Sequence, residues 1–225
     1  MKNIIAIMDT ETIGLYPKYI YDFGYVIQDK KGNKLFEASH LVEEIVTDAK
    51  VMMGAFYAGK MFTHYLPLVD AGMIDIRPFS YIYDEFLQAC SDYNVNVLAA
   101  YNLGFDLRAL KETKRQLNYK AHMQGNYKLL DVWQFACESL LNRPTFKTLA
   151  TNEKWVSPAG NFRTNAEVAY KYASGNLQAV EAHTALCDAR IEGEILTQCY
   201  RQNKKIPYGK FDAQPWRIVN ENKMD

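Results

Sequence analysis

Two carboxylates near the N-terminus have types and spacing that suit metal chemistry. Asp9 and Glu11 directly follow residues 4–8, a continuous apolar run typical of a strand buried on both faces. Because residues i and i+2 of an extended chain point to the same side, both carboxylates are expected in one crevice at the carboxyl end of that strand. Two like charges in one crevice repel each other unless a cation lies between them, and oxygen ligands suit Mg²⁺ or Mn²⁺. The alternative is that Glu11 faces solvent and Asp9 caps a turn.

A second pair of polar residues follows another apolar run, residues 95–101. Asn102 is a favourable helix N-cap, because its side-chain oxygen can accept a hydrogen bond from a free backbone N–H group. Leucines at helical spacing over residues 103–117 predict a helix whose first turn contains Asp106. The helix dipole favours a carboxylate at that position.

A histidine and a carboxylate stand near the C-terminus, ahead of a helix predicted over residues 191–200. Asp188 follows His183 by five positions. Small residues recur every four positions through this region, at Ala185, Ala189 and Gly193. Such a stripe lets a helix approach another element closely, and Asp188 beside it is expected to face inward. A buried carboxylate requires a partner, and a metal ion is the obvious one.

The three groups together match a known pattern. They are Asp9-x-Glu11, Asn102-x-x-Phe105-Asp106 and His183-x-x-x-x-Asp188. In order and local spacing they resemble the three motifs of the DEDDh 3′→5′ exonucleases, relatives of the proofreading subunit of bacterial DNA polymerase III. The resemblance covers residues 4–196, and a histidine five positions before the last carboxylate is typical of the His branch of this family.

The resemblance implies an α/β fold of the ribonuclease H-like class. Its mixed central sheet would contain three N-terminal strands, including a hairpin, and two more, flanked by helices. It also implies phosphodiester hydrolysis with two ions, Mg²⁺ or Mn²⁺, about 3.5–4 Å apart. Asp9 would bridge both ions, Glu11 and Asp188 would hold the first, and Asp106 would help to hold the second. His183 would be the general base, which suits a group with an ordinary pKa of about 6.5, and the alternative is a structural histidine near a helix start.

Substrate contacts are implied for a further set of residues. These are Thr10, Thr12, Leu15, Asn102, Phe105 and Arg108. Leu15 is expected to wedge against the terminal base, and the alternative is a turn residue anchored in the core. A basic stripe at helical spacing, formed by Arg108, Lys111 and Arg115, either guides the strand or is a solvated helix face.

Periodicity predicts the elements around these groups. Residues 19–28 and 34–43 have the pattern of a hairpin, and residues 79–93 that of an amphipathic helix. Residues 47–68 are too apolar for a free surface helix and are expected in the core, with stacking of some aromatic rings on an unpaired base as the alternative. Asp131 is expected to cap a further helix, with a supporting role near the metals as the alternative.

The segment of residues 151–175 departs most from the bacterial proofreading subunits. Residues 155–162 have the pattern of a small hairpin with Pro-Ala-Gly-Asn as its turn. Thr164 and Glu167 have the spacing of a capping box at a helix start. Because this insert precedes His183, it either borders the substrate cleft or is a structural flap. Together with the short chain, it resembles exonucleases carried by bacteriophages.

Composition predicts one globular domain, residues 1–225. Of the 225 residues, 48% are hydrophobic and 23% are charged, and no stretch has the pattern of a membrane span or a secretion signal. The four cysteines form no Cys-x-x-Cys pair, which favours free buried thiols in the cytoplasm, or in the host cytoplasm if a phage encodes the chain. A formal net charge of zero argues against tight duplex binding, but not against a nuclease that grips a few nucleotides.

We therefore expect a metal-dependent 3′→5′ exonuclease that releases nucleoside 5′-monophosphates from a single-stranded or frayed 3′ end, with DNA favoured over RNA. The expected partner is that nucleic-acid end and not a membrane, while a homodimer or a polymerase partner stays open. One alternative is a non-catalytic nucleic-acid-binding or polymerase-associated module. The loss of one or more metal ligands would signal such a module, but all five expected site positions are occupied by the required residue types. The other is an endonuclease on the same fold, which gives no reason for the pairing of His183 with Asp188.

Overall fold

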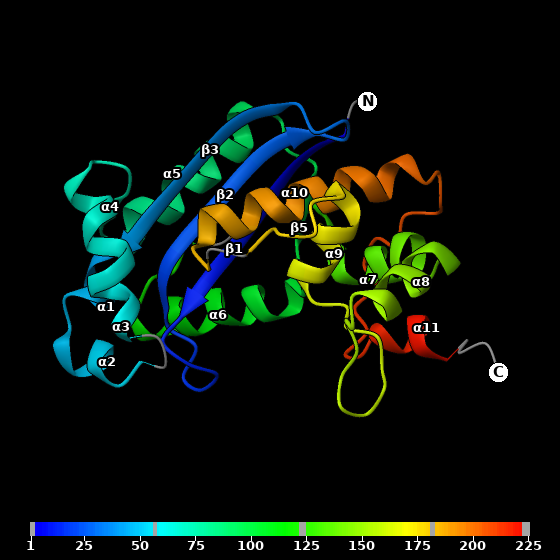
Figure 1. Ribbon diagram of the computed structural model, residues 1–225. Helices are drawn as coiled ribbons and strands as arrows, with labels where there is room; N and C mark the ends of the chain where they lie inside the picture. The colour runs from blue at the N-terminus through cyan, green and yellow to red at the C-terminus, as the bar shows by residue number, and fades with distance from the viewer. Residues whose placement is uncertain (1–2, 56–57, 122–124, 181–182, 222–225) are drawn as a thin grey trace.

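A six-stranded mixed sheet positions the rest of the chain in the computed structural model, which describes residues 3–55, 58–121, 125–180 and 183–221 (Figure 1). The strand order is β4-β3-β2-β1-β5-β6. The strands are β1 (Ile4–Thr12), β2 (Ile20–Asp29), β3 (Lys34–Val42), β4 (Asp75–Arg77), β5 (Val97–Ala100) and β6 (Lys128–Asp131). The central position of β1 explains its continuous apolar sequence, because a strand with neighbours on both sides and helices on both faces meets no solvent.

Strand direction divides the sheet into two parts. β1, β2 and β3 pair antiparallel, which confirms the predicted hairpin, while β5 and β6 continue from β1 in parallel. The sequence predicted five strands and missed β4, which pairs in parallel with β3 at the sheet edge. All three β4 residues are exposed, so β4 lacks the apolar pattern from which a strand is predicted.

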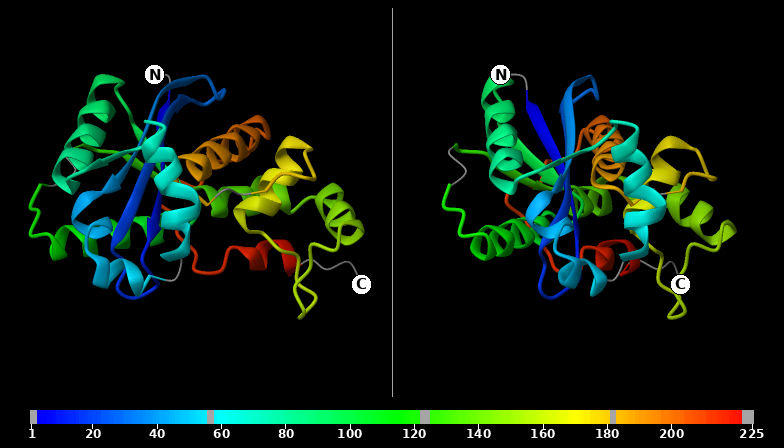
Figure 2. Two further views of the ribbon diagram at one scale, coloured as in Figure 1. Left: turned by 60° about the vertical axis from the view of Figure 1, so that its left-hand side comes forward. Right: turned by 90° about the vertical axis from the view of Figure 1, so that its left-hand side faces the viewer.

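Alternate residues of β1 enter two separate cores. Ala6 and Met8 pack into the core shared with α5 (Phe79–Asp92) and α6 (Leu103–Gln116). Ile5 and Ile7 pack into the core on the opposite face, which is covered by α10 (Ala185–Arg201). Figure 2 shows these helices on the two sides of the sheet.

Shorter helices complete the second core beyond β6. They are α7 (Val132–Ala136), the π-helical turn η2 (Cys137–Leu141), α8 (Pro144–Asn152), α9 (Ala166–Ser174) and α11 (Trp216–Asn220). All four cysteines are free, and all except the partly exposed Cys187 are buried, largely as predicted. Among the described residues, no helix has both the length and the apolar character that crossing a membrane requires.

Residues 43–55 and 58–70 form a series of short helical turns. These are α1 (Glu43–Val46), α2 (Ala49–Met53), α3 (Ala58–Lys60), the π-helical turn η1 (Met61–Tyr65) and α4 (Leu66–Asp70). Core packing is confirmed for Met52 and Tyr65 but is wrong for Met53 and Phe62, which are 74% and 67% exposed. The predicted core residues Phe56 and Tyr57 lie outside the described residues. Helical turns this short have no single apolar face, so the number of apolar residues in the segment does not predict how many of them are buried.

Three polar residues were predicted to cap helices, and the structure bears out one of these caps. Asn102 does precede α6, but its side chain makes no cap hydrogen bond. Its backbone has φ of 68°, a left-handed conformation that asparagine adopts more readily than most residues. Asp131 caps α7 as predicted, accepting a hydrogen bond from the backbone N–H of Gln134 at 3.0 Å. The capping box at Thr164 is wrong, because α9 begins one residue later, after Asn165.

The N-terminus of α10 lies directly on β2. Gly24 has no side chain at the contact point, where a Cβ atom would lie 2.3 Å from the backbone N of Leu186. Asp22, two residues earlier on the same face, accepts a hydrogen bond from the backbone N–H of Ala185 at 2.9 Å. A buried carboxylate therefore holds the positive end of the helix dipole against the sheet.

We expect Gly24→Ala to lower the free energy of unfolding by about 3 kcal/mol, because the added methyl group overlaps backbone atoms that cannot move independently. Gly54→Ala is the matched control, since its Cβ meets only ordinary contacts at 3.6 Å. Chemical denaturation of both variants measures the difference. A Gly24→Ala protein as stable as the control would contradict this account of the contact.

Candidate metal centre

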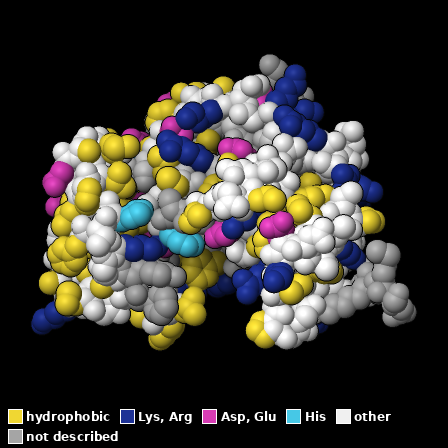
Figure 3. All heavy atoms as spheres, viewed as in Figure 1, with side chains coloured by type: hydrophobic (Ala, Val, Ile, Leu, Met, Phe, Trp, Pro, Cys, Tyr) yellow, Lys and Arg dark blue, Asp and Glu magenta, His cyan; other side chains and the backbone are white. Residues whose placement is uncertain are grey.

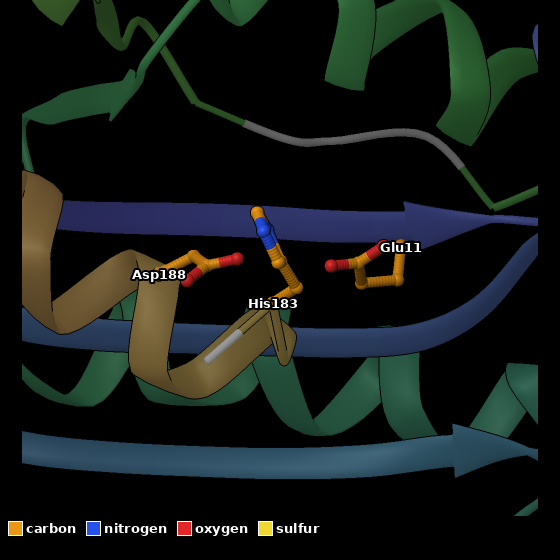
Figure 4. Close-up of side chains that lie close together, drawn as sticks. All are labelled: Glu11, His183 and Asp188. Atoms are coloured by element: carbon orange, nitrogen blue, oxygen red, sulfur yellow. The ribbon is translucent and has the colours of Figure 1, made fainter. Parts of the chain in front are cut away.

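Acidic side chains from β1 and α10 meet at the carboxyl end of β1. Asp9 and Glu11 continue the side of the strand on which Ile5 and Ile7 face α10. Glu11, His183 and Asp188 each offer a ligand atom, and these atoms all lie within 4.8 Å of one another. Figure 4 shows the carboxylates of Glu11 and Asp188 pointing toward each other, with the His183 side chain between them.

Asp9 and Asp106 extend the acidic cluster beyond these three residues. Burial is the main cause that raises the pKa of Asp9 well above its ordinary value. Further increases come from the negative charges of neighbouring carboxylates, which in decreasing order are Glu192, Asp106, Asp188 and Glu11. Five carboxyl groups therefore interact around the end of β1.

Asp106 occupies the first turn of α6, as predicted, and is buried. Burial raises its pKa to about 7, although hydrogen bonds from Thr10 oppose this rise. The Thr10 hydroxyl donates to Asp106 Oδ1 at 2.8 Å. The Thr10 side chain is buried and bonds to a predicted metal ligand, while its contact with substrate stays a prediction.

The donor set of this cluster suits a divalent cation. Carboxylate oxygens dominate it, one imidazole nitrogen stands beside them, and the buried carboxyls repel one another when they ionise. A hard cation such as Mg²⁺ or Mn²⁺ would offset that repulsion. Figure 3 shows acidic, basic and histidine side chains gathered in the middle of one face of the molecule.

His183 lies just before α10 and is exposed. Its backbone adopts φ of 53°, in the left-handed region, and its carbonyl oxygen accepts a hydrogen bond from Lys60 Nζ at 3.0 Å. Partial burial lowers the pKa of His183, and the positive charge of Lys60 lowers it further. The imidazole is therefore neutral, and able to accept a proton, at neutral pH.

Sequence reasoning missed three residues of this site. Glu192 is 2% exposed and lies four residues after Asp188, so the helical period alone would have placed it on the same face. Lys60 lies 3.6 Å from Glu11 Oε1, and no local pattern brings residue 60 to this strand end. Asp22 stands in a strand whose other residues are mostly apolar, which was the available signal.

The remaining predicted substrate residues differ in their exposure. Leu15 is 78% exposed on the β1–β2 loop, so its anchoring in the core is wrong, while its contact with a base stays a prediction. Thr12 donates to the carbonyl of Gly14 at 3.0 Å and shapes that loop. Phe105 is half-buried, and Asn102 lines a cavity beside Asp9. The basic stripe is exposed throughout, at Arg108, Lys111 and Arg115.

Comparison with solved structures finds the same fold in two exonucleases. Exonuclease X in complex with 5′-overhanging duplex DNA aligns with 96% of this chain and 99% of its own, at a TM-score of 0.52 and 18% identity. A moderately thermophilic Exonuclease I from Methylocaldum szegediense aligns with 98% of this chain at a TM-score of 0.56 and 16% identity. This chain spans 43% of that second protein. No family model and no curated protein matches the sequence. The likeness confirms the predicted ribonuclease H-like α/β fold.

Stability of the metal-free protein should depend on pH through the buried carboxyls. A carboxyl whose pKa is raised on folding stabilises the fold below its unfolded pKa of about 4, and this contribution is lost as the pH rises through the folded pKa. Because the pKa of Asp106 is about 7 and that of Asp9 is also raised, we expect the melting temperature to fall from about pH 5 to about pH 7.5. Mg²⁺ or Mn²⁺ should restore it at the higher pH and have little effect at the lower.

Asp106→Asn is the control for this pH dependence, because asparagine keeps an oxygen for the Thr10 hydroxyl but does not ionise. Thermal melts with EDTA should show a shallower fall for this variant. If the melting temperature of the variant and of the wild type fell equally steeply with pH, Asp106 would not be the source of the pH dependence.

Proposed function

We propose that this protein is a metal-dependent 3′→5′ exonuclease that releases nucleoside 5′-monophosphates from single-stranded or frayed ends. The observation that carries the proposal is the approach of Glu11, His183 and Asp188 to within 4.8 Å, from β1 and the start of α10. The fold alone does not require two carboxylates and an imidazole to meet at this point. The fold similarity to exonucleases supports the same conclusion.

The proposed chemistry divides between the metal ligands and one base. Glu11 and Asp188 would hold one cation, and Asp9 with Asp106 would complete the site for a second. Bound Mg²⁺ or Mn²⁺ supplies positive charge that stabilises the phosphoryl and leaving oxygens. His183 accepts the proton of the attacking water through its neutral imidazole.

Lys60 holds the base in place. Its ammonium group donates to the His183 carbonyl and lies beside Glu11, so it fixes the backbone of the histidine relative to the end of β1. The exposed ring of His183 remains accessible to a nucleic-acid end. The net charge of zero supports the choice of a short single-stranded end over a long duplex, because duplex binding rests on many basic contacts.

Digestion of end-labelled oligonucleotides tests the activity. Single-stranded DNA and RNA of one sequence are labelled at the 5′ end and incubated with Mg²⁺, Mn²⁺ or EDTA. We expect a ladder that shortens from the 3′ end with either metal and intact substrate with EDTA, with DNA digested faster than RNA. A stable internal cut would indicate an endonuclease, and binding without cleavage in either metal would indicate a non-catalytic module.

Asp188→Asn should abolish cleavage and weaken Mn²⁺ binding while the fold persists, because it removes one ligand charge from the metal group. Glu194→Gln is the matched control, since Glu194 is an exposed carboxylate on the same helix. Oligonucleotide digestion and calorimetric Mn²⁺ titration measure the two effects. Cleavage by Asp188→Asn at more than a trace of the wild-type rate would exclude the ligand assignment.

His183→Ala should slow cleavage by about 10²–10⁴-fold and leave Mn²⁺ binding in place, because the carboxylates remain. The residual rate should climb with pH after the wild type has levelled off, since hydroxide replaces the missing base. His64→Ala, at an exposed histidine, is the control and should have no effect. A His183→Ala rate within a few-fold of wild type at neutral pH would make His183 structural.

A further inference from the structure

A cavity of about 710 Å³ opens beside the acidic cluster on the side of the small hairpin. Asp9 and Glu192 form its acidic end. Trp133 and Trp216 line it further along, and Arg163 is the only basic side chain among its described lining residues. Its volume lies within the range of small-molecule sites, so it has room for one nucleotide rather than for a base-paired duplex.

The hairpin that forms one wall of the cavity is fixed at its base. Val156 bridges Phe162, and the turn is closed by a hydrogen bond from Gly160 to Ser157, one residue earlier than the turn predicted from the sequence. Trp133 Nε1 donates to the Thr164 hydroxyl at 2.8 Å, and the Tyr101 hydroxyl donates to the carbonyl of the same threonine. The wall is therefore tied to the end of β5 and to α7.

The hairpin is also fixed to α11. Asn220 accepts a hydrogen bond from the backbone N–H of Phe162 at 2.8 Å, and its amide donates to the carbonyl of Trp216 at 2.9 Å. One asparagine thus sets the distance between the hairpin and the indole that faces the cavity. Such a preformed wall lowers the entropic cost of binding, which a loose flap would not do.

The lining chemistry is that of a nucleotide site. Flat aromatic faces stack on nucleobases of any sequence, and a guanidinium pairs with a phosphate. Asn161 and Asn165 add amide groups, which can bond to base edges. The acidic end repels a phosphate unless a cation is present, so the ligand phosphate belongs at Arg163 or at the metal centre and the base belongs between them.

We propose that this cavity binds one unpaired nucleotide of the substrate strand next to the scissile phosphate, with its base against Trp216 and its phosphate against Arg163. This inference rests on the proposed exonuclease function, because the cavity shares Asp9 with the metal centre. It assigns residues 155–165 to substrate binding rather than to a structural flap.

Direct titration tests the site without any need for cleavage. Deoxyadenosine 5′-monophosphate and deoxyadenosine are titrated separately in Mg²⁺ by isothermal calorimetry, whose signal does not depend on any one tryptophan. Trp216→Leu should weaken binding of both ligands about tenfold, because it removes the ring and keeps an apolar side chain. Trp216→Phe should restore most of the affinity. Arg163→Ala should weaken only the monophosphate, because deoxyadenosine has no phosphate to lose.

Steady-state cleavage of single-stranded DNA provides the second readout. Trp216→Leu and Arg163→Ala should each raise KM about tenfold and change kcat less than threefold, because both act on binding. Arg201→Ala, an exposed arginine at the far end of α10, should change neither. Thermal melting checks that each variant folds. If a Trp216 variant does not fold, the Arg163→Ala variant still tests the proposal, because Arg163 is exposed.

The outcomes separate this inference from the proposed function. Cleavage by the wild type with unchanged KM and unchanged ligand affinity in both variants would overturn the cavity assignment and leave the exonuclease intact. Saturable binding of the monophosphate that depends on Arg163, in a protein that cleaves nothing, would keep the nucleotide site and overturn the exonuclease. Equal weakening of both ligands by Arg163→Ala would overturn the phosphate contact.

Discussion

The contact between the start of α10 and β2 is the constraint on which the site depends. Gly24 allows the helix backbone to touch the strand, and Asp22 accepts a hydrogen bond from its first N–H group. His183 and Asp188 are then fixed relative to β1, because β1 and β2 pair along their whole length. A side chain at Gly24 would separate the two halves of the metal group. The geometry of the candidate metal centre is therefore a consequence of how closely a helix approaches a sheet.

That approach carries an electrostatic cost. Asp9, Glu11, Asp106, Asp188 and Glu192 converge at the end of β1, where burial and then the other four carboxylates raise the pKa of Asp9. Compensating contacts within the described part of the chain include the Thr10 hydroxyl at Asp106 and the Lys60 ammonium beside Glu11. Burial of apolar side chains in the two cores offsets the free-energy cost of bringing these carboxylates together. A bound cation would lower that cost. Function and stability thus oppose each other at the end of β1, as they do at many functional sites.

The sequence predicted those features that depend on short-range pattern. The apolar run before Asp9, the hairpin of β2 and β3 and the helix α6 all have periodicities that tertiary contacts did not override. Asp106 and Asp188 were found because each lies beside an apolar or small-residue face. Lys60 was missed because its contacts with Glu11 and His183 join segments far apart in the chain. The capping box at Thr164 failed for the same reason, since the Thr164 hydroxyl is bonded to Trp133.

Residues 58–65 touch the site at two points, and this has a consequence for its dynamics. Lys60 binds the carbonyl of His183, and the Tyr65 hydroxyl donates to Asp22 at 2.7 Å. The short turns around them expose the apolar side chains of Met53, Phe62 and Leu66, so we expect this segment to open at a lower free energy than the sheet does. Opening it releases the histidine backbone and one partner of Asp22 and withdraws Tyr65 from the core shared with α5 and α6, while the core covered by α10 stays closed. The candidate site therefore has its own local unfolding equilibrium, and on warming we expect its geometry to be lost before the sheet melts.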